Sequence, residues 1–307
     1  MPPLLSAFLG RPSLASSLAV SFGVQTAAYL YSTLGRPVPT EHYYDLSGSL
    51  THLAIISHAL ATSALNSPTG LPPARVALLG ALSATWAIRL GTYLYARVQR
   101  VGKDDRFDEL KKDPVRWLTP WVFQALWCFM IQAPVTIAAT ASVRAGVAAA
   151  GLTRWDYLGA SVFLGGLAWE ITADRQKDAF KRTRPSEPFT GGLFKYSVYA
   201  NYFGECSLWW GAYLMSVPAI SAMGSSVTWL HAVSLTSPLF TAFLLHRVSG
   251  IPLLEKSAWK KYGGDQKWLE YRARTSVFWP WVPKSGAVSK AEVEEMKRKA
   301  VAKWKVE

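Results

Sequence analysis

Cysteines and charged residues are both scarce in this chain of 307 residues. Asp, Glu, Lys and Arg make up 17% of it, whereas an average soluble domain has roughly 25%. Its two cysteines, Cys128 and Cys206, lie in apolar stretches and offer neither a disulfide framework nor metal-ligand spacing. Hydrophobic residues reach 50% and gather in long blocks with almost no charge. This distribution predicts an integral membrane protein.

Acidic residues are outnumbered by basic ones, 20 against 33, which gives a net charge of +13. Such a charge can indicate a nucleic-acid partner, but the sequence has no zinc-ligand or helix-turn-helix pattern. It also has no Gly-x-Gly-x-x-Gly after a strand, so no Rossmann domain is expected. Because the basic residues flank apolar blocks, we interpret them as topology signals and expect no nucleic-acid partner.

Seven apolar blocks are long enough, or nearly so, to cross a bilayer. About 20 apolar residues span the roughly 30 Å hydrocarbon core, and backbone groups in lipid must bond within their own segment. The predicted fold is therefore all-α, a polytopic integral membrane bundle of about seven transmembrane helices. The blocks are about 13–34, 48–66, 73–96, 117–140, 155–173, 199–220 and 226–246, of which the second and fifth are the weakest.

The connections between these blocks alternate in charge. Residues 97–116 contain seven Lys or Arg, residues 174–195 contain six, and the region from Arg247 onward contains fourteen. Of the alternate connections, 67–72 and 221–225 contain none, and 141–154 contains only Arg144 and Arg154. By the positive-inside rule, the basic segments and the C-terminus are predicted to be cytosolic.

The composition changes after Pro283, which predicts a membrane domain over 1–283 and a charged cytosolic tail over 284–307. The tail is expected to form a solvated helix or a frayed end. Lys303 and Lys305 stand at the fifth and third positions from the end. They resemble the dilysine retrieval signal of endoplasmic-reticulum membrane proteins and predict that location.

Polar residues exceed what a membrane scaffold needs in three stretches: 41–45, 170–205 and 247–280. Lys177 and Lys181 are one helical turn apart, so both point to the same face. Two such cations can hold a phosphate or pyrophosphate, or they can contact lipid headgroups. Asn201 and Glu205 also share a face. A carboxylate there is costly unless it has a function, or unless a helix-end cluster pairs it with the basic loop.

These stretches resemble the steroid 5α-reductases and sterol C14/C7 reductases. The segment before the cofactor site of sterol reductases is similar to Gln176-Lys177-x-x-Phe180-Lys181 followed by Pro185-Ser186-Glu187-Pro188. The steroid 5α-reductase signature is similar to Gly192-Leu193-Phe194-x-Tyr196-x-x-x-Ala200-Asn201-Tyr202-Phe203-Gly204-Glu205-x-x-x-Trp209. The end of both groups is similar to Leu254-Glu255-Lys256, Lys261-Tyr262-Gly263, Trp268-x-x-Tyr271-x-x-Arg274 and Pro280.

The closest likeness is to DUF1295-like relatives that share the steroid-reductase C-terminal domain. Their sequences also contain segments similar to Arg89-Leu90-Gly91, Arg97 and Gly102-x-Asp104-x-Arg106-Phe107 of this chain. The likeness covers roughly 40–283, with the steroid-reductase C-terminal-like part over about 117–283. Many relatives read Ser-Arg-His-Pro-Asn-Tyr where this chain has Ser197-Val198-Tyr199-Ala200-Asn201-Tyr202, so the roles of that Arg and His cannot be carried over.

The resemblance implies an NADPH-dependent reductase of a carbon–carbon double bond in a lipophilic substrate: a steroid, a sterol or an enoyl lipid. It implies cytosolic cofactor-binding loops, with Lys177 and Lys181 contacting phosphates. The implied partners are the lipid bilayer and the lipophilic substrate, and no metal is expected. The cofactor-binding candidates are Asp174, Lys177, Lys181, Tyr196, Asn201, Tyr202, Glu205, Glu255, Tyr262, Tyr271 and Arg274.

The resemblance further implies an acid near the second helix and a tyrosine on the third, which stabilise a developing enolate. The catalytic candidates are Glu41 or Asp45, and Tyr93 or Tyr95. His52 and His58 are alternative proton donors, although such a histidine is more often a satisfied polar group between helices.

Two other functions stay open. One is a membrane methyltransferase resembling isoprenylcysteine carboxyl methyltransferases, whose Arg-His-Pro signature this chain lacks. Its cofactor, S-adenosylmethionine, carries far less negative charge, so Lys177 and Lys181 would be dispensable. The other is a non-catalytic membrane protein that binds lipid.

Overall fold

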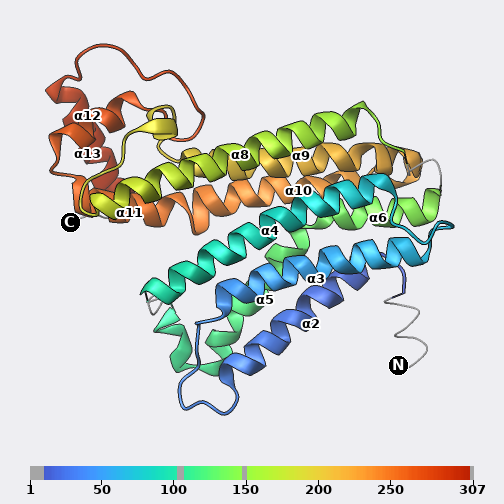
Figure 1. The fold of residues 1–307 in the computed structure, drawn as a ribbon. Helices are drawn as coiled ribbons and strands as arrows, with labels where there is room; N and C mark the ends of the chain where they lie inside the picture. Colours follow the sequence, from blue (N-terminus) through green and yellow to red (C-terminus); the bar gives the residue numbers. More distant parts are fainter. Residues whose placement is uncertain (1–9, 102–106, 147–150, 305–307) are drawn as a thin grey trace. The chain divides into compact units, whose positions relative to one another are not determined.

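The computed structural model describes residues 10–101, 107–146 and 151–304 (Figure 1). Within these ranges every regular element is helical, which confirms the all-α class. The chain divides into two compact units. Unit 1 is Met1–Ser161 with Trp210–Phe240, and unit 2 is Val162–Trp209 with Thr241–Glu307.

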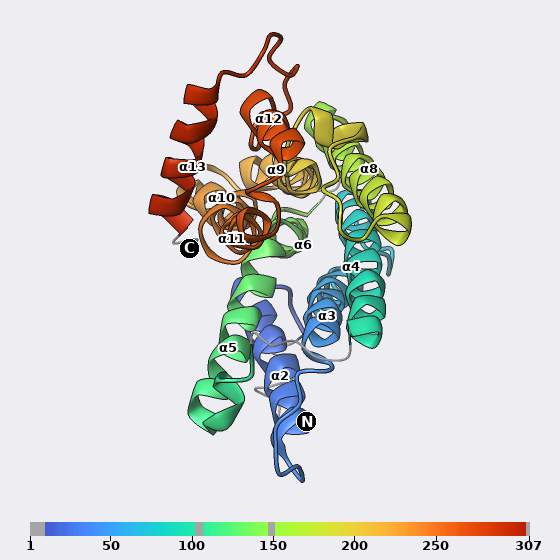
Figure 2. The same ribbon diagram turned by 90° about the vertical axis from the view of Figure 1, so that its left-hand side faces the viewer.

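Unit 1 is built around α3 (Tyr44–Leu65), which packs against α2, α4, α5 and α6 (Figures 1 and 2). Local sequence explains where two of these helices begin. Ser13 and Ser16 form a capping box before α2, and the Asp113 carboxylate accepts the Val115 N–H at 2.8 Å before α5. The other elements of unit 1 are α2 (Leu14–Thr33), α4 (Ala74–Val101), η2 (Leu110–Lys112), α5 (Pro114–Ile131), α6 (Ala133–Ala145), η4 (Ser225–Val227) and parts of α8 (Arg154–Thr183), α9 (Ala200–Ala222) and α10 (Leu230–Phe243).

The block predicted over 117–140 is not a single helix. α5 ends at Ile131, α6 begins at Ala133, and the two are bent by 52°. Pro134 lies in the first turn of α6 and has no N–H to donate to a carbonyl of α5, so the hydrogen-bond ladder is interrupted there. The prediction of one continuous helix was wrong at this point.

One described helical stretch, Ser225–Tyr262, is long and apolar enough to cross a membrane. The bent pair α5 and α6 adds a second candidate if it is counted as one span. The other five predicted blocks form α2, α3, α4, α8 and α9 at or near the expected bounds without meeting this test. Polar side chains lower their hydropathy, as Gln25 does in α2 and His52 in α3.

Unit 2 brings the second half of α8 against the start of α9 at two glycines. A Cβ atom on Gly204 would lie 2.7 Å from both the Glu170 nitrogen and the Gly166 oxygen, so no larger residue fits without moving a backbone. This close approach positions the charged end of α8 beside the start of α9. The remaining elements of unit 2 are η3 (Gly192–Lys195), the π-helical turn η5 (Leu244–Val248), α11 (Ile251–Tyr262), α12 (Gln266–Arg274) and α13 (Lys290–Trp304).

The C-terminal helix α13 is not the solvated helix or frayed end that its composition predicted. Val293 and Ala300 are buried in a core cluster with Trp259, Trp268 and Leu269 of α11 and α12. Met296 packs against the same cluster, and the spacing of three and four residues places all three apolar side chains on one face. The charged residues between them concealed this face in the sequence.

A buried ion pair joins two helix starts in unit 1. Arg75 Nε lies 2.7 Å from Asp156 Oδ1, and the two side chains are 1% and 0% exposed. Arg75 also donates to Asp156 Oδ2 at 2.9 Å and to the Gly151 carbonyl at 2.6 Å. Thr153 donates its N–H and its hydroxyl to the same carboxylate.

We expect Arg75→Leu and Asp156→Leu each to destabilise the protein by about 3–5 kcal/mol, because each leaves one buried charge without its partner. The double variant should recover much of this loss, since neither charge remains. Thermal unfolding of the detergent-purified protein, followed by tryptophan fluorescence, measures the effect. Losses that simply add in the double variant would contradict a coupled pair.

Candidate cofactor site

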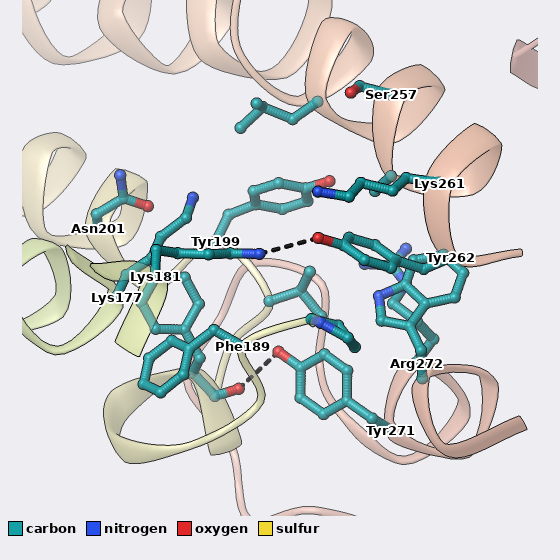
Figure 3. A pocket seen from close by; sticks show the side chains of 16 residues that line it. Lys177, Lys181, Phe189, Tyr199, Asn201, Ser257, Lys261, Tyr262, Tyr271 and Arg272 are labelled. Carbon is teal, nitrogen blue, oxygen red and sulfur yellow. Dashed lines mark hydrogen bonds between the residues drawn. The ribbon is translucent and has the colours of Figure 1, made fainter. Parts of the chain in front are cut away.

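A basic cavity of about 280 Å³ lies within unit 2, lined by the end of α8, the start of α9, α11 and α12 (Figure 3). Four of its lining residues are cationic: Lys177, Lys181, Lys261 and Arg272. Among the residues that the structure describes, no carboxylate lines it. A cavity with this charge is suited to an anion, and its size is near the lower end of ligand pockets, about 300–1,000 Å³.

Lys181 and Tyr262 point toward each other in this cavity, as Figure 3 shows. Lys181 Nζ donates to the Tyr262 hydroxyl at 2.9 Å and to the Pro185 carbonyl at 3.3 Å. Lys261 Nζ donates to that same carbonyl at 3.2 Å. Two ammonium groups thus share one neutral acceptor, and a negatively charged ligand would satisfy both more strongly.

Lys177 and Asn201 line the cavity with unused polar groups. Across the described part of the chain, neither side chain forms a hydrogen bond or an ion pair. The Lys177 ammonium lies 5.8 Å from the centre of the Phe194 ring. Burial lowers the pKa of Lys177 from its ordinary value because it disfavours the charged form. A bound anion would offset this cost.

The turn that carries Phe194 is held in place by the residue preceding Lys177. Gln176 Oε1 accepts the Leu193 N–H at 2.8 Å. Gly192 has φ +55°, and a Cβ atom on it would lie 2.0 Å from that oxygen. Only glycine fits this position, so the pair Gln176 and Gly192 places the aromatic ring beside the lysine.

The Glu255 side chain does not line this cavity and is buried inside unit 2. Its side chain is 3% exposed and accepts from Tyr199 Oη at 2.6 Å, Trp259 Nε1 at 2.9 Å and Arg272 at 2.7 Å. Both carboxylate oxygens therefore have protein donors, and the residue joins α11 to α12 and to the start of α9.

Five of the predicted cofactor-binding residues line the cavity together: Lys177, Lys181, Asn201, Tyr262 and Tyr271. The hydroxyl of Tyr271 donates to the Phe194 carbonyl at 2.8 Å. The other predicted residues are not among its lining residues: Asp174, Tyr196, Tyr202, Glu205, Glu255 and Arg274.

Several of these six interact with other residues of unit 2. Asp174 contributes its negative charge to the surroundings of Lys177. The Tyr202 ring stacks on Tyr199, with 5.8 Å between centroids. The Tyr196 and Arg274 carbonyls accept backbone N–H groups from the 281–284 segment.

Tyr199, Lys261 and Arg272 are among the lining residues that sequence reasoning did not select. Lys261 and Arg272 adjoin Tyr262 and Tyr271, which were selected, so adjacency was the available signal. Tyr199 occupies the position where this chain departs from the Arg-His-Pro of its relatives, and nothing in the sequence connected it with Glu255.

The catalytic candidates lie in unit 1. Asp45 is in the first turn of α3, and Tyr93 is on α4. Glu41 lies 2.7 Å from Lys111 Nζ, and the two side chains are 10% and 12% exposed. Burial lowers the pKa of Lys111, but the charges and hydrogen bonds of Glu41 and Asp108 outweigh it and raise that pKa overall. Glu41 therefore serves as the carboxylate of an ion pair.

The remaining candidates in unit 1 contact other side chains. Tyr95 is 37% exposed, with its ring 6.4 Å from that of His42. His52 is hydrogen-bonded to Gln132 at 3.2 Å, and His58 to Ser16 at 2.9 Å. These bonds favour a structural role for both histidines.

The fold and the cavity define an all-helical protein with a cavity lined by cationic side chains. The chain belongs to the family described as "Protein of unknown function (DUF1295)", whose model matches residues 40–275. No curated protein matches the chain. No solved structure matches it.

The matched range contains every residue that lines the cavity and ends before α13. Some predicted features, Gly102, Asp104, Arg106 and Lys305, lie outside the described residues.

We expect Lys177 to become reactive toward an acylating reagent at a lower pH than free N-acetyl-lysine amide, because burial lowers its pKa. Competitive labelling over a pH series, read by mass spectrometry, gives the pH at which Lys177 reaches half of its maximal reactivity. This midpoint does not depend on the absolute rate of labelling. Adding pyrophosphate should move that midpoint upward, since an anion favours the protonated amine. A midpoint at or above that of the free amide would contradict this description of the site.

Proposed function

We propose that this chain is a membrane-embedded, NADPH-dependent reductase of a carbon–carbon double bond in a lipophilic substrate: a steroid, a sterol or an enoyl lipid. The observation that carries the proposal is the cavity of unit 2, where Lys177, Lys181 and Lys261 converge without a lining carboxylate in the described chain. NADPH is multiply negative, and lysine ammonium groups are established phosphate ligands in proteins.

The residues present fit the phosphates of such a cofactor. Lys177, Lys181 and Lys261 would hold them, and Asn201 offers an amide that has no partner within the described residues. Lys177 gains most from an anion because its ammonium is otherwise without a hydrogen bond. S-adenosylmethionine fits less well, since it brings little negative charge to three cations. This favours the reductase over the methyltransferase.

A bound NADPH would supply the hydride for one carbon of the alkene. The protein must then provide a proton for the neighbouring carbon and donors for any developing enolate oxygen, worth about 3–4 kcal/mol for a well-placed donor. We retain Asp45 and Tyr93 for these tasks. Glu41 remains the alternative carboxylate to Asp45, and it lies 2.7 Å from Lys111 Nζ.

We also propose the polytopic arrangement of about seven spans, in the endoplasmic reticulum and with a cytosolic C-terminus. Its support is the distribution of polar groups in unit 1. The buried residues of α2 are all polar, namely Ser16, Ser17, Ser21, Gln25 and Ser32. α5 meanwhile exposes Leu118, Val122, Phe123 and Leu126. A helix in water does the reverse, whereas helices in lipid associate through small and polar residues.

Lys177→Ala, Lys181→Ala and Lys261→Ala are each expected to weaken NADPH binding by roughly tenfold, because each removes one charge-assisted contact. Lys256→Ala, on α11 but outside the cavity, is the matched control and should bind like the wild type. Thermal stabilisation of the purified protein over a ligand series measures this. The proposal would be contradicted if S-adenosylmethionine alone stabilised the protein, or if NADPH left its unfolding midpoint unchanged.

Asp45→Asn and Tyr93→Phe are expected to reduce turnover by at least about 100-fold, as loss of a general acid or of an enolate donor does. NADPH affinity should stay unchanged. The assay follows NADPH consumption with a panel of sterol enones and long-chain enoyl lipids. Glu41→Gln should mainly lower the unfolding midpoint, because it leaves Lys111 with Asp108, at 3.3 Å, in place of two carboxylate partners. Full turnover in both Asp45→Asn and Tyr93→Phe would remove these residues from the mechanism.

A further inference from the structure

A second cavity, of about 640 Å³, lies in unit 2 between η5, α11 and α13. One part of its wall is apolar and includes Ile251, Trp259, Val277 and Met296. The other part is basic and consists of Arg247, Arg272, Lys299 and Lys303. Glu255 is the one acidic residue lining it in the described chain, and its two oxygens already accept three protein donors. The cavity therefore combines net positive charge with apolar surface.

Two of these basic groups have unused hydrogen-bonding capacity. The Arg272 side chain is 9% exposed, and its Nε is buried without a partner in the described residues. An unsatisfied buried donor of this kind costs about 1–3 kcal/mol. Arg247 forms no ion pair or hydrogen bond within the described part of the chain. Lys299 has only an exposed partner, Glu295, at 2.6 Å.

The position of this cavity along the chain points to the membrane surface. Arg247 directly follows the block predicted to span over 226–246, and it lies within Ser225–Tyr262, the one continuous stretch of the described residues that is apolar enough to cross a bilayer. Basic residues at the cytosolic end of a span attract anionic lipid headgroups.

The 277–282 segment has the character of a membrane interface. Trp279, Trp281 and Val282 are 70%, 74% and 73% exposed. Tryptophan favours the boundary between headgroups and acyl chains. Ring contacts connect this segment to the cavity: His246, which lines it, lies 4.2 Å from Phe278, and Phe278 lies 5.6 Å from Trp279. Cationic groups and exposed aromatic rings thus lie together on unit 2.

We propose that this second cavity binds the phosphate headgroup of an anionic phospholipid from the cytosolic leaflet, with the 277–282 segment in the interface beside it. Arg247, Lys299 and Lys303 would contact the headgroup, while Met296 and Val277 would contact the glycerol and upper acyl region. α13 lies beyond the range matched by the family model, so much of this site is formed by the C-terminal extension. The proposal shares the membrane location with the proposed function but does not depend on NADPH.

The test compares the wild-type chain with Arg247→Gln/Lys299→Gln and with the control Lys290→Gln/Arg298→Gln. The control removes the same charge from α13 at exposed residues outside the cavity. Each protein, in detergent, is titrated with short-chain phosphatidic acid, with phosphatidylcholine of the same chain length and with inorganic phosphate, and the unfolding midpoint is recorded.

Phosphatidic acid should stabilise the wild type and the control alike. The cavity variant should need at least roughly tenfold more phosphatidic acid for the same stabilisation, since each surface cation contributes about 1 kcal/mol to binding. Phosphatidylcholine and inorganic phosphate should have little effect. Lys299→Glu, at a side chain that is 72% exposed, poses little risk to folding and should shift binding in the same direction if the double variant does not fold.

Equal stabilisation by phosphatidylcholine would overturn the proposal, as would equal response of the cavity variant and the control. Stabilisation by inorganic phosphate alone, if the cavity variant loses it and the control keeps it, would assign the cavity to a free anion instead. NADPH titrated into the same preparations reports on the other cavity, so failure of one proposal is distinguishable from failure of the other.

Discussion

The arrangement of unit 2 depends on one buried carboxylate. Glu255 accepts hydrogen bonds from Tyr199, Trp259 and Arg272, and so holds α11 to α12 and to the start of α9. A buried charge is tolerated only when it is fully bonded, because its desolvation otherwise costs several kcal/mol. Arg272 lines both cavities of unit 2, so this contact determines the shape of the wall they share.

The two cavities differ in what surrounds their cations. In the first, lysines from α8 and α11 lie among aromatic rings and share a backbone carbonyl as acceptor. In the second, the cations lie next to apolar side chains and an exposed aromatic segment. The first therefore suits the phosphates of the proposed cofactor, and the second suits the headgroup of the proposed lipid. This contrast comes from the neighbours of the basic residues, since the residue types are the same.

Polar contacts also organise unit 1. Gln25 donates to Thr51 at 2.8 Å, and Thr136 to Ser17 at 3.0 Å, each between different helices. Arg75 and Asp156 tie the start of α4 to the start of α8. Hydrogen bonds and ion pairs of this kind add little net stability in water, but they position helices relative to one another in an apolar surrounding. They explain why helices that carry serine, threonine and histidine can still be membrane helices, as we propose.

The sequence by itself determined the helical class, because long apolar blocks leave the backbone no other way to satisfy its hydrogen bonds. It also predicted that Lys177 and Lys181 share a face, and it selected Asn201, Tyr262 and Tyr271, which line the same cavity, because local spacing and motif were sufficient for them. Only the tertiary structure decided that Lys261 and Tyr199 join them, that Glu255 lies in the wall, and that α13 is packed rather than solvated. The first two outcomes depend on contacts between residues some 50 to 80 positions apart, and the third depends on which face of α13 packs against α11 and α12. Local sequence patterns contain no information about either.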